Sequence, residues 1–255
     1  RAAEKGHLDV VKKLIEWGGK AEVYRRDSCG DFPIRVAARS GDLATFNYLI
    51  DLGGIQQIDE CSFHLFNDAA MGGNVDILKT IRTRRGPGVV KAKGRFLLSA
   101  LHYAASEGHA AAVAQLLEWG CADEIDKPDC RSLTPFHLGA FCGRLDVLKV
   151  LYSKFGERLL EQRDEAGQFA IHLAAGEFND NADVVTQLIE WGGIKELEKK
   201  RHDGLTLFGV AALCGRADAL RAMHAKGGQA LLSQKEEDSG NFPIHAAAGG
   251  SSGDA

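Results

Sequence analysis

Apolar residues recur along this chain at the spacing of one face of an amphipathic helix. In one segment the apolar side chains are Leu145, Val147, Leu148, Val150 and Leu151, and polar residues fill the intervening positions. This spacing predicts a helix that buries one face. A pair of small residues lies a few positions upstream and predicts another helix that approaches the first closely. The predicted unit is therefore two helices joined by a short turn.

This unit recurs along the whole chain, and a pair of small residues, Ala-Ala or Gly-Ala, marks each copy. Successive pairs are 32 to 37 residues apart. Self-similarity at this period predicts a solenoid of stacked units instead of one globular core with one active site. The pairs begin at Ala2, Ala37, Ala69, Ala104, Gly139, Ala174, Ala211 and Ala247.

Prolines and glycines punctuate each unit at fixed positions. Pro33, Pro135 and Pro243 stand where the first helix of a unit begins, a position that tolerates proline because no partner for its N–H is needed. A glycine three residues after the small pair predicts a tight turn with positive φ. These turn glycines are Gly6, Gly41, Gly73, Gly108, Gly143 and Gly215. The glycines predicted to end the second helix are Gly18, Gly53, Gly120, Gly156, Gly192 and Gly227.

The fullest copy of the pattern reads SLTPFHLGAFCGRLDVLKVL, from Ser132 to Leu151. Other copies read GDFPIRVAARSGDLATFNYLI, ALHYAASEGHAAAVAQLLEWGC and GNFPIHAAAGG. A line T-P-L-H-x-A-A, then x-x-G-H, then an apolar helix ending in L-L-x-x-G-A is typical of the ankyrin repeat. The chain resembles the ankyrin repeat family in eight copies that cover nearly its whole length.

The resemblance implies an all-α fold: an ankyrin-repeat solenoid of stacked helix–turn–helix units with short hairpin-like fingers. We expect a right-handed stack, little regular sheet, and turns at signals such as Asp27–Gly30 and Asp164–Gly167. The expected units are a partial repeat at 1–26, complete repeats at 27–58, 59–93, 94–128, 129–163, 164–200 and 201–236, and a partial repeat at 237–255.

The two ends of the sequence predict a fragment of a longer protein. The chain lacks an initiator Met, and its final residues, GGSSGDA, permit two interpretations. They are either a flexible linker or a longer inter-helix turn like that after Ala174. We favour the turn, because neither end carries the polar face that normally caps a solenoid.

Composition and cysteine usage exclude several classes of protein. The chain is 45% hydrophobic and 26% charged, which suits a soluble, folded protein, and no apolar run reaches the length of a membrane span. Its six cysteines form no C-x-x-C pair and match no zinc pattern. Reduced thiols predict an intracellular, cytoplasmic or nuclear-type location. No cofactor and no metal are expected.

Most of the nine histidines belong to the repeat pattern. His102, His137, His172 and His245 occupy the His of the T-P-L-H line, where the family uses it to tie a turn to the neighbouring repeat. Arg35, Asn67 and Gly209 replace this residue in three repeats, and we expect those turns to be less firmly tied. His7 and His109 occupy the G-H position, and His64, His202 and His224 have no recognisable acid or nucleophile partner. We therefore expect no enzyme activity in this chain, since no nucleotide-binding, hydrolase or zinc-protease motif is present either.

One segment interrupts the pattern with positive charge. Residues 82–95, RTRRGPGVVKAKGR, carry six basic side chains and no acid, whereas the rest of the chain carries a net charge of −10. The segment is either a solvated irregular loop or a docking patch for an acidic protein surface, phosphate or anionic lipid. It is too short to predict a nucleic-acid-binding face. Its basic residues are Arg82, Arg84, Arg85, Lys91, Lys93 and Arg95.

A second recurring feature is a large apolar residue just before the glycine that ends each second helix. These residues either cover the loop that follows or form an apolar outer ridge that binds a partner. They are Trp17, Leu52, Trp119, Phe155 and Trp191.

Because no catalytic motif is present, we expect the function to depend on a binding surface. In the ankyrin family the first helices and the fingers form a concave groove that binds proteins, and the variable positions around the small pair face it. Carried over by register, these positions are Arg39, Met71, Tyr103, Glu107, Phe141, Glu177 and Leu213. Phe141 is equally compatible with packing between repeats. We expect a protein-interaction scaffold or targeting arm, and alternatively a regulatory segment of a larger enzyme or channel.

Overall fold

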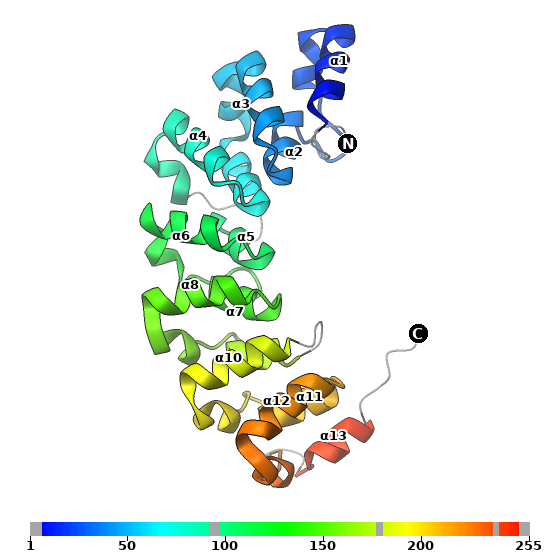
Figure 1. Ribbon diagram of the computed structural model, residues 1–255, viewed down its shortest axis with the longest axis vertical. Coiled ribbons are helices and arrows are strands. Elements are labelled where there is room, and N and C mark those ends of the chain that lie inside the picture. Colours follow the sequence, from blue (N-terminus) through cyan, green and yellow to red (C-terminus); the bar gives the residue numbers. More distant parts are fainter. Residues whose placement is uncertain (1–6, 92–96, 177–180, 237–239, 250–255) are drawn as a thin grey trace. The chain divides into compact units, whose positions relative to one another are not determined.

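The protein is built from helices with short turns between them (Figure 1). The computed structural model describes residues 7–91, 97–176, 181–236 and 240–249, except for the side chains of 54–63. These residues contain no extended strand, although an isolated antiparallel bridge links Lys200 and Thr206. The expected all-α fold is confirmed.

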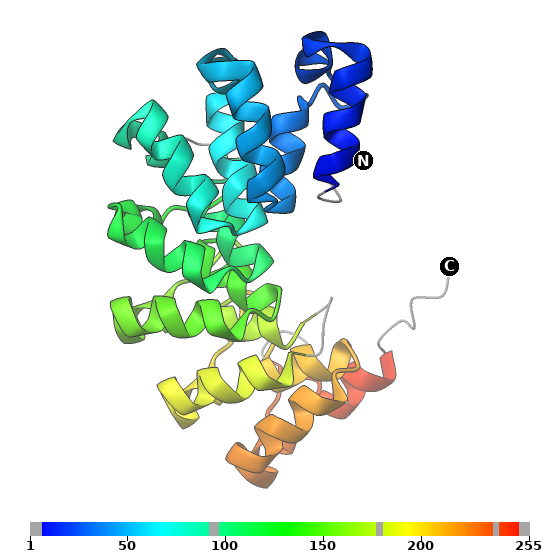
Figure 2. The same cartoon turned by 45° about the horizontal axis from the view of Figure 1, so that its top comes forward.

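The chain forms two compact units, Arg1–Cys130 and Arg131–Ala255. The elements of the first unit are α1 (Leu8–Gly18), η1 (Lys20–Tyr24), α2 (Pro33–Ser40), α3 (Leu43–Gly72), α4 (Val75–Arg85), η2 (Pro87–Lys91), α5 (Ala100–Glu107), α6 (Ala110–Glu118) and η4 (Cys121–Glu124). Those of the second are α7 (Pro135–Phe141), α8 (Leu145–Phe155), η5 (Gly156–Glu161), α9 (Ala170–Ala174), α10 (Ala182–Gly192), η6 (Ile194–Glu198), α11 (Leu207–Leu213), α12 (Ala217–Gly227), η7 (Gly228–Ser233) and α13 (Pro243–Gly249). The views in Figures 1 and 2 show the helices within each unit lying side by side.

The predicted punctuation is confirmed at most positions. Helices α2, α7 and α13 begin at their prolines. The turn glycines that the structure describes all have positive φ, between +67° and +91°, which residues with a Cβ rarely adopt. The small pairs are buried in α2, α3, α5 and α9, where they allow neighbouring helices to approach closely.

One predicted turn is absent. Helix α3 runs without a break through Gly53, which was expected to end a helix, and through the predicted repeat boundary between residues 58 and 59. The sequence explains this difference. Other fingers contain an Asp-x-x-Gly turn signal, as at Asp27–Gly30, whereas residues 55–66 contain neither glycine nor proline to interrupt a helix.

Two histidines of the repeat pattern, His102 and His137, tie their turns to the neighbouring repeat as expected. The Ser99 N–H donates to His102 Nδ1 at 3.2 Å, and His102 Nε2 lies 3.0 Å from the Lys127 carbonyl. The equivalent distances for His137 are 3.3 Å to the Thr134 N and 3.2 Å to the Gln162 carbonyl. His172 is also buried, and burial, followed by the charge of Arg201, lowers its pKa to about 3. His102 and His137 therefore act as structural residues, and the lowered pKa keeps His172 neutral at physiological pH.

Arg35 and Gly209 replace the histidine in two repeats, and we expected their turns to be less firmly held. This expectation is wrong, because other hydrogen bonds hold both turns. In the repeat of Gly209, the buried Glu236 carboxylate takes the place of the ring. It accepts hydrogen bonds from the Thr206 N–H at 2.8 Å and the Thr206 hydroxyl at 3.0 Å. A Cβ on Gly209 would lie 2.0 Å from Glu236 Oε1, so glycine leaves room for the carboxylate in this position.

The Glu236 tie predicts different outcomes for two substitutions. Glu236→Ala should cost about 1–3 kcal/mol, because it leaves the buried Thr206 N–H unpaired. Burial raises the pKa of Glu236, although the Thr206 donors partly oppose the shift, so the folded state binds this proton more tightly than the unfolded state. The contribution of Glu236 to stability is therefore full at acid pH and falls as the pH rises through the folded pKa.

Glu236→Gln should accordingly match the wild type in urea midpoint at pH 4 and exceed it at pH 7. The exposed Glu198→Ala is the matched control and should change neither midpoint by more than about 0.5 kcal/mol equivalent. Equal midpoints for Glu236→Ala and Glu198→Ala would contradict the assignment.

The cysteines that the structure describes are free thiols. Cys121 is buried with its thiol 3.6 Å from the Val90 carbonyl, and burial raises its pKa to about 12. Cys61 lies outside the described side chains. None of the helices in the described part of the chain is long and apolar enough to cross a membrane.

Candidate protein interface

Three residues of the predicted groove line one pocket in the first unit. Arg39 comes from α2, Met71 from the end of α3 and Tyr103 from α5. The pocket has a volume of about 310 Å³, and its other lining residues are Cys29, Asp31, Arg35, His64, Asn67 and Asp68. Glu107 is exposed at the end of α5 and does not line it.

An ion-pair network forms the floor of this pocket. Asp31 and Asp68 are both buried. Arg35 Nε donates to Asp68 at 2.6 Å, and Arg35 Nη1 also pairs with Asp31. Arg39 Nη2 lies 2.8 Å from Asp31 and 3.0 Å from Asp68. Burial lowers the pKa of Arg39, but the charges of Asp68 and Asp31 outweigh burial and raise it overall. Two cations and two anions therefore leave the floor without net charge.

Asn67 replaces the histidine in its repeat, and its side chain forms no hydrogen bond that would hold the turn. It is buried, and neither its amide nitrogen nor its amide oxygen has a hydrogen-bond partner within the described residues. For this repeat the expectation of a less firmly tied turn agrees with the structure. An unpaired buried amide costs about 1–3 kcal/mol, so the position is a local weakness beside the pocket.

The second unit opens another pocket at the corresponding helix ends. Phe141 of α7 and Leu213 of α11 line it together with His172, Arg201 and Val210, around a volume of about 200 Å³. Phe141 is half-buried, whereas Leu213 is exposed. The pocket lining combines apolar side chains with polar ones, and Arg201 supplies the cationic group. Glu177 lies outside the described residues.

The basic segment is partly engaged within its own unit. Arg82 stacks its guanidinium 4.9 Å from the centre of the Trp119 ring, and Arg84 lies 3.8 Å from Asp51. Lys91 pairs with Asp123 at 3.0 Å, a contact that lowers the pKa of that carboxyl. Arg85 is exposed at the end of α4, whereas Lys93 and Arg95 lie outside the described residues.

The residues of the predicted outer ridge have different environments. Trp119 lies 6.5 Å from Phe66, and Trp191 stacks on Tyr152 at 4.1 Å between ring centres. Phe155 and Leu52 are half-buried. Trp17 is 76% exposed and stands apart from this group.

Comparison with protein families agrees with the helix-pair pattern. A sequence model described as "Ankyrin repeats (3 copies)" matches residues 66–163, and one described as "Ankyrin repeats (many copies)" matches residues 1–50. The chain belongs to the ankyrin-repeat family. Ankyrin repeats are in general protein-interaction modules.

Two curated proteins are similar in sequence to this chain, one over a short segment and the other over most of it. The chain is 38% identical over 50 residues to the ankyrin repeat-containing protein ITN1 of Arabidopsis thaliana, which covers 20% of this chain and 8% of that protein. It is 26% identical over 233 residues to the transient receptor potential cation channel subfamily A member 1 of Homo sapiens, covering 88% of this chain and 20% of the channel. The chain thus spans at most a fifth of either relative.

The sequence analysis did not identify Asp31 and Asp68, the two aspartates of the pocket in the first unit. Asp31 precedes Pro33 in one finger, and Asp68 follows Asn67 in the next repeat, so nothing local connects them. The available signal was Arg35 at a position that normally holds histidine. A charged residue at a buried structural position requires a counter-charge from a neighbouring repeat.

Proposed function

We propose that this ankyrin domain binds a protein partner through the two pockets on its inner-helix ends. The observation that carries the proposal is the grouping of Arg39, Met71 and Tyr103 around one pocket and of Phe141 and Leu213 around another. These residues come from separate repeats, and each stands next to the small pair of its repeat: Tyr103 precedes its pair, and the other four follow theirs. Bulky groups around a hollow are typical anchors of protein interfaces.

The chemistry of the first pocket favours a polar but uncharged segment of the partner. Asp31, Asp68, Arg35 and Arg39 neutralise one another, so the floor attracts neither a cation nor an anion strongly. Met71 and Tyr103 add apolar walls. In the second pocket Phe141 and Leu213 supply apolar surface and Arg201 a positive charge, which suits an apolar side chain beside a carboxylate.

A second candidate function is a regulatory ankyrin segment of a larger protein whose active part lies outside this chain. The observation that favours it is the 233-residue likeness to a cation channel, which extends over 88% of this chain. Both candidates use the same surfaces. They differ in whether the bound segment belongs to another protein or to the rest of the same polypeptide.

Photo-crosslinking can test the proposed surface directly. A photoreactive phenylalanine analogue at Tyr103 or Leu213 should crosslink the partner in cells that express the intact parent protein. The same analogue at Ile194, which is 60% exposed in η6, provides the matched control and should not. Capture from Ile194 alone would contradict the proposal. A crosslink within one polypeptide would favour the regulatory segment.

Once the partner is purified, alanine substitutions give the size of the effect. Tyr103→Ala and Phe141→Ala should each weaken binding about thirtyfold, which corresponds to about 2 kcal/mol, measured by calorimetry on folded variants. The double variant Arg84→Glu/Arg85→Glu should instead slow association and reduce its salt sensitivity. Normal binding by both alanine variants would place the interface elsewhere, with the outer ridge the next surface to test.

A further inference from the structure

The pocket of the second unit lies where three inner helices follow one another. Helix α9 packs on α7 and on α11. The pocket takes Phe141 from α7, His172 and Leu173 from α9, and Val210 and Leu213 from α11. Its volume is about 200 Å³, whereas a cavity of about 150 Å³ holds one benzene molecule. The pocket therefore accommodates one apolar side chain and a small polar group.

Arg201 carries the one charge among the described residues that line this pocket, because the lowered pKa of His172 keeps that ring neutral. Arg201 Nη2 lies 3.1 Å from Asp203, but the Asp203 side chain is 52% exposed and does not line the pocket. An ion pair with an exposed carboxylate contributes little, because water screens it. Arg201 is therefore available to a carboxylate that enters the pocket.

The surroundings of the pocket are positive as well. Burial, and then the charge of Arg201, lower the pKa of His172, and the charges of Lys199 and Arg163 lower it further. The charges with the largest effect on this ring thus belong to cations, which attract a negative group. Lys199 already pairs with Glu196 at 2.7 Å, so Arg201 is the main source of this attraction.

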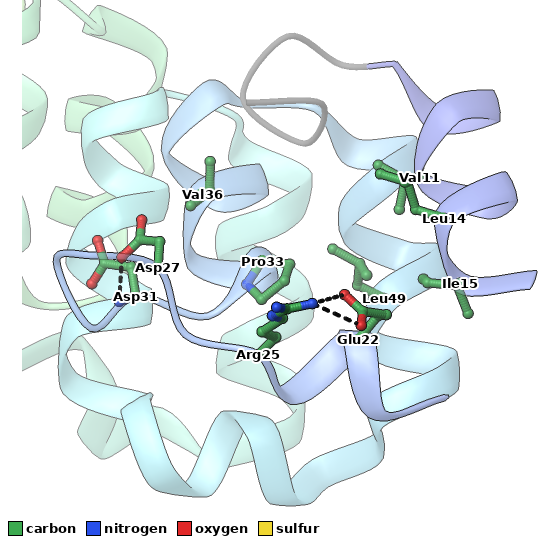
Figure 3. A pocket seen from close by; sticks show the side chains of 10 residues that line it. All are labelled: Val11, Leu14, Ile15, Glu22, Arg25, Asp27, Asp31, Pro33, Val36 and Leu49. Carbon is green, nitrogen blue, oxygen red and sulfur yellow. Dashed lines mark hydrogen bonds and ion pairs between the residues drawn. The ribbon is translucent and has the colours of Figure 1, made fainter. Parts of the chain in front are cut away.

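A pocket of similar volume in the first unit has the opposite character. Figure 3 shows Arg25 Nη1 of that pocket donating to Glu22 Oε1, at 3.1 Å. Asp27 and Asp31 line the same pocket and add two carboxylates. Three acids and one base disfavour a further carboxylate there. A pocket that favours an anion is therefore a specific feature of the second unit.

The small volume of the second unit's pocket restricts how a partner can supply both an apolar group and a carboxylate. In an extended segment, side chains on the same face are about 7 Å apart, so they do not enter one small hollow together. At the end of a polypeptide, the α-carboxylate and the side chain are attached to the same Cα. A C-terminal apolar residue therefore brings both groups into the pocket without a second side chain.

We propose that this pocket binds the C-terminal residue of a partner protein, with its α-carboxylate on Arg201 and its apolar side chain against Phe141 and Leu213. The inference rests on the proposed function, because it names the part of the partner that the second pocket holds. Capture of a C-terminal carboxylate is a recurring mode of peptide recognition. Leu213 is 46% exposed, so a terminal apolar side chain that covers it removes apolar surface from water.

Immobilised peptide pools test this inference with the full 255-residue chain. Each pool contains short peptides that are random except for the last residue, which is leucine with a free carboxylate, leucine amide or glutamate amide. Fluorescently labelled chain should be retained at least about tenfold better on the leucine acid pool than on the leucine amide pool, because the amide loses the charge-assisted hydrogen bond. The glutamate amide pool tests whether a side-chain carboxylate is sufficient, and it should retain as little as the leucine amide pool.

Variants assign the retention to this pocket. Arg201→Gln and Leu213→Asp should each reduce retention on the leucine acid pool about tenfold. Arg201→Lys keeps the charge and should retain more than Arg201→Gln. Leu232→Asp is the matched control for Leu213→Asp, since Leu232 is 47% exposed and does not line the pocket. Lys226→Gln is the control for the lost positive charge, since Lys226 pairs with the exposed Glu190 at 3.7 Å. Both controls should bind like the wild type, and circular dichroism confirms that each variant is folded.

Three results would overturn the inference. Equal retention on the leucine acid and leucine amide pools would show that the pocket does not recognise a chain terminus. Stronger retention on the glutamate amide pool would assign it to an acidic side chain within a segment. A preference for the leucine acid pool that persists in folded Arg201→Gln and Leu213→Asp would place the carboxylate elsewhere. The proposed function is tested separately by crosslinking from Tyr103 and Leu213, which does not depend on a free terminus.

Discussion

Ala140→Asp should destabilise the second unit by about 3–5 kcal/mol, the cost of leaving an uncompensated charge in a protein interior. Ala140 belongs to the small pair of α7 and has no exposed surface. A carboxylate there must either remain charged without water or bind a proton at neutral pH. Both routes raise the free energy of the folded state relative to the unfolded state.

The chain contains its own control for this substitution. Ala248 is the second residue of the small pair in α13, as Ala140 is in α7, but it is exposed. Ala248→Asp should therefore change stability by no more than about 0.5 kcal/mol. Urea denaturation followed by circular dichroism compares the two variants. Equal midpoints would show that the small pairs do not mark helix contacts.

The parts of the fold that sequence predicts are those set by local chemistry. Proline at the start of α7, positive-φ glycine at Gly143 and histidine at His137 act within a few residues of themselves. Because the chain repeats these signals, each copy supports the others. The fold class therefore follows from the sequence, whereas the groove positions stay a prediction. The predicted groove residues that line a pocket all stand next to the small pair of their repeat.

The parts that sequence did not predict depend on contacts between repeats or on an absent signal. Helix α3 continues because residues 55–66 contain no glycine or proline to end it. A missing turn signal is harder to recognise in a sequence than a motif that is present. Gly72 illustrates a distant cause: a Cβ there would lie 2.3 Å from the Ala38 carbonyl, so α2 and α3 require this glycine for close approach. The neighbouring Gly73, with φ of +72°, makes the turn. The sequence shows only two adjacent glycines.

The pocket chemistry was hidden for the same reason. Arg35 and Asp68 lie 33 residues apart, and their pairing depends on how successive inner helices align. An arginine at a position that holds histidine in most repeats predicts that some acid must be near. It does not identify that acid.

The second large effect concerns this network. Asp68→Ala should cost about 3 kcal/mol, because removing one partner of a buried ion pair leaves the other uncompensated. Asp68 accepts from Arg35 Nε at 2.6 Å and from Arg39 Nε and Nη2 at 3.2 and 3.0 Å. Without it, only Asp31 remains to balance the two guanidinium groups. Asp51→Ala is the control, since Asp51 is exposed and lies 3.8 Å from Arg84.

The same substitution separates a structural role from a role in specificity. Removing Asp68 gives the pocket floor a net charge of about +1 from the groups of the network. Arg35→Met/Asp68→Leu instead removes one charge of each sign and should recover much of the lost stability, because apolar pairs often replace buried ion pairs at little cost. If both variants bind the partner like the wild type, the network acts in folding alone. If only Asp68→Ala gains affinity for acidic peptides, the neutral floor excludes them in the native protein. A stability for Asp68→Ala equal to that of Asp51→Ala would contradict both roles.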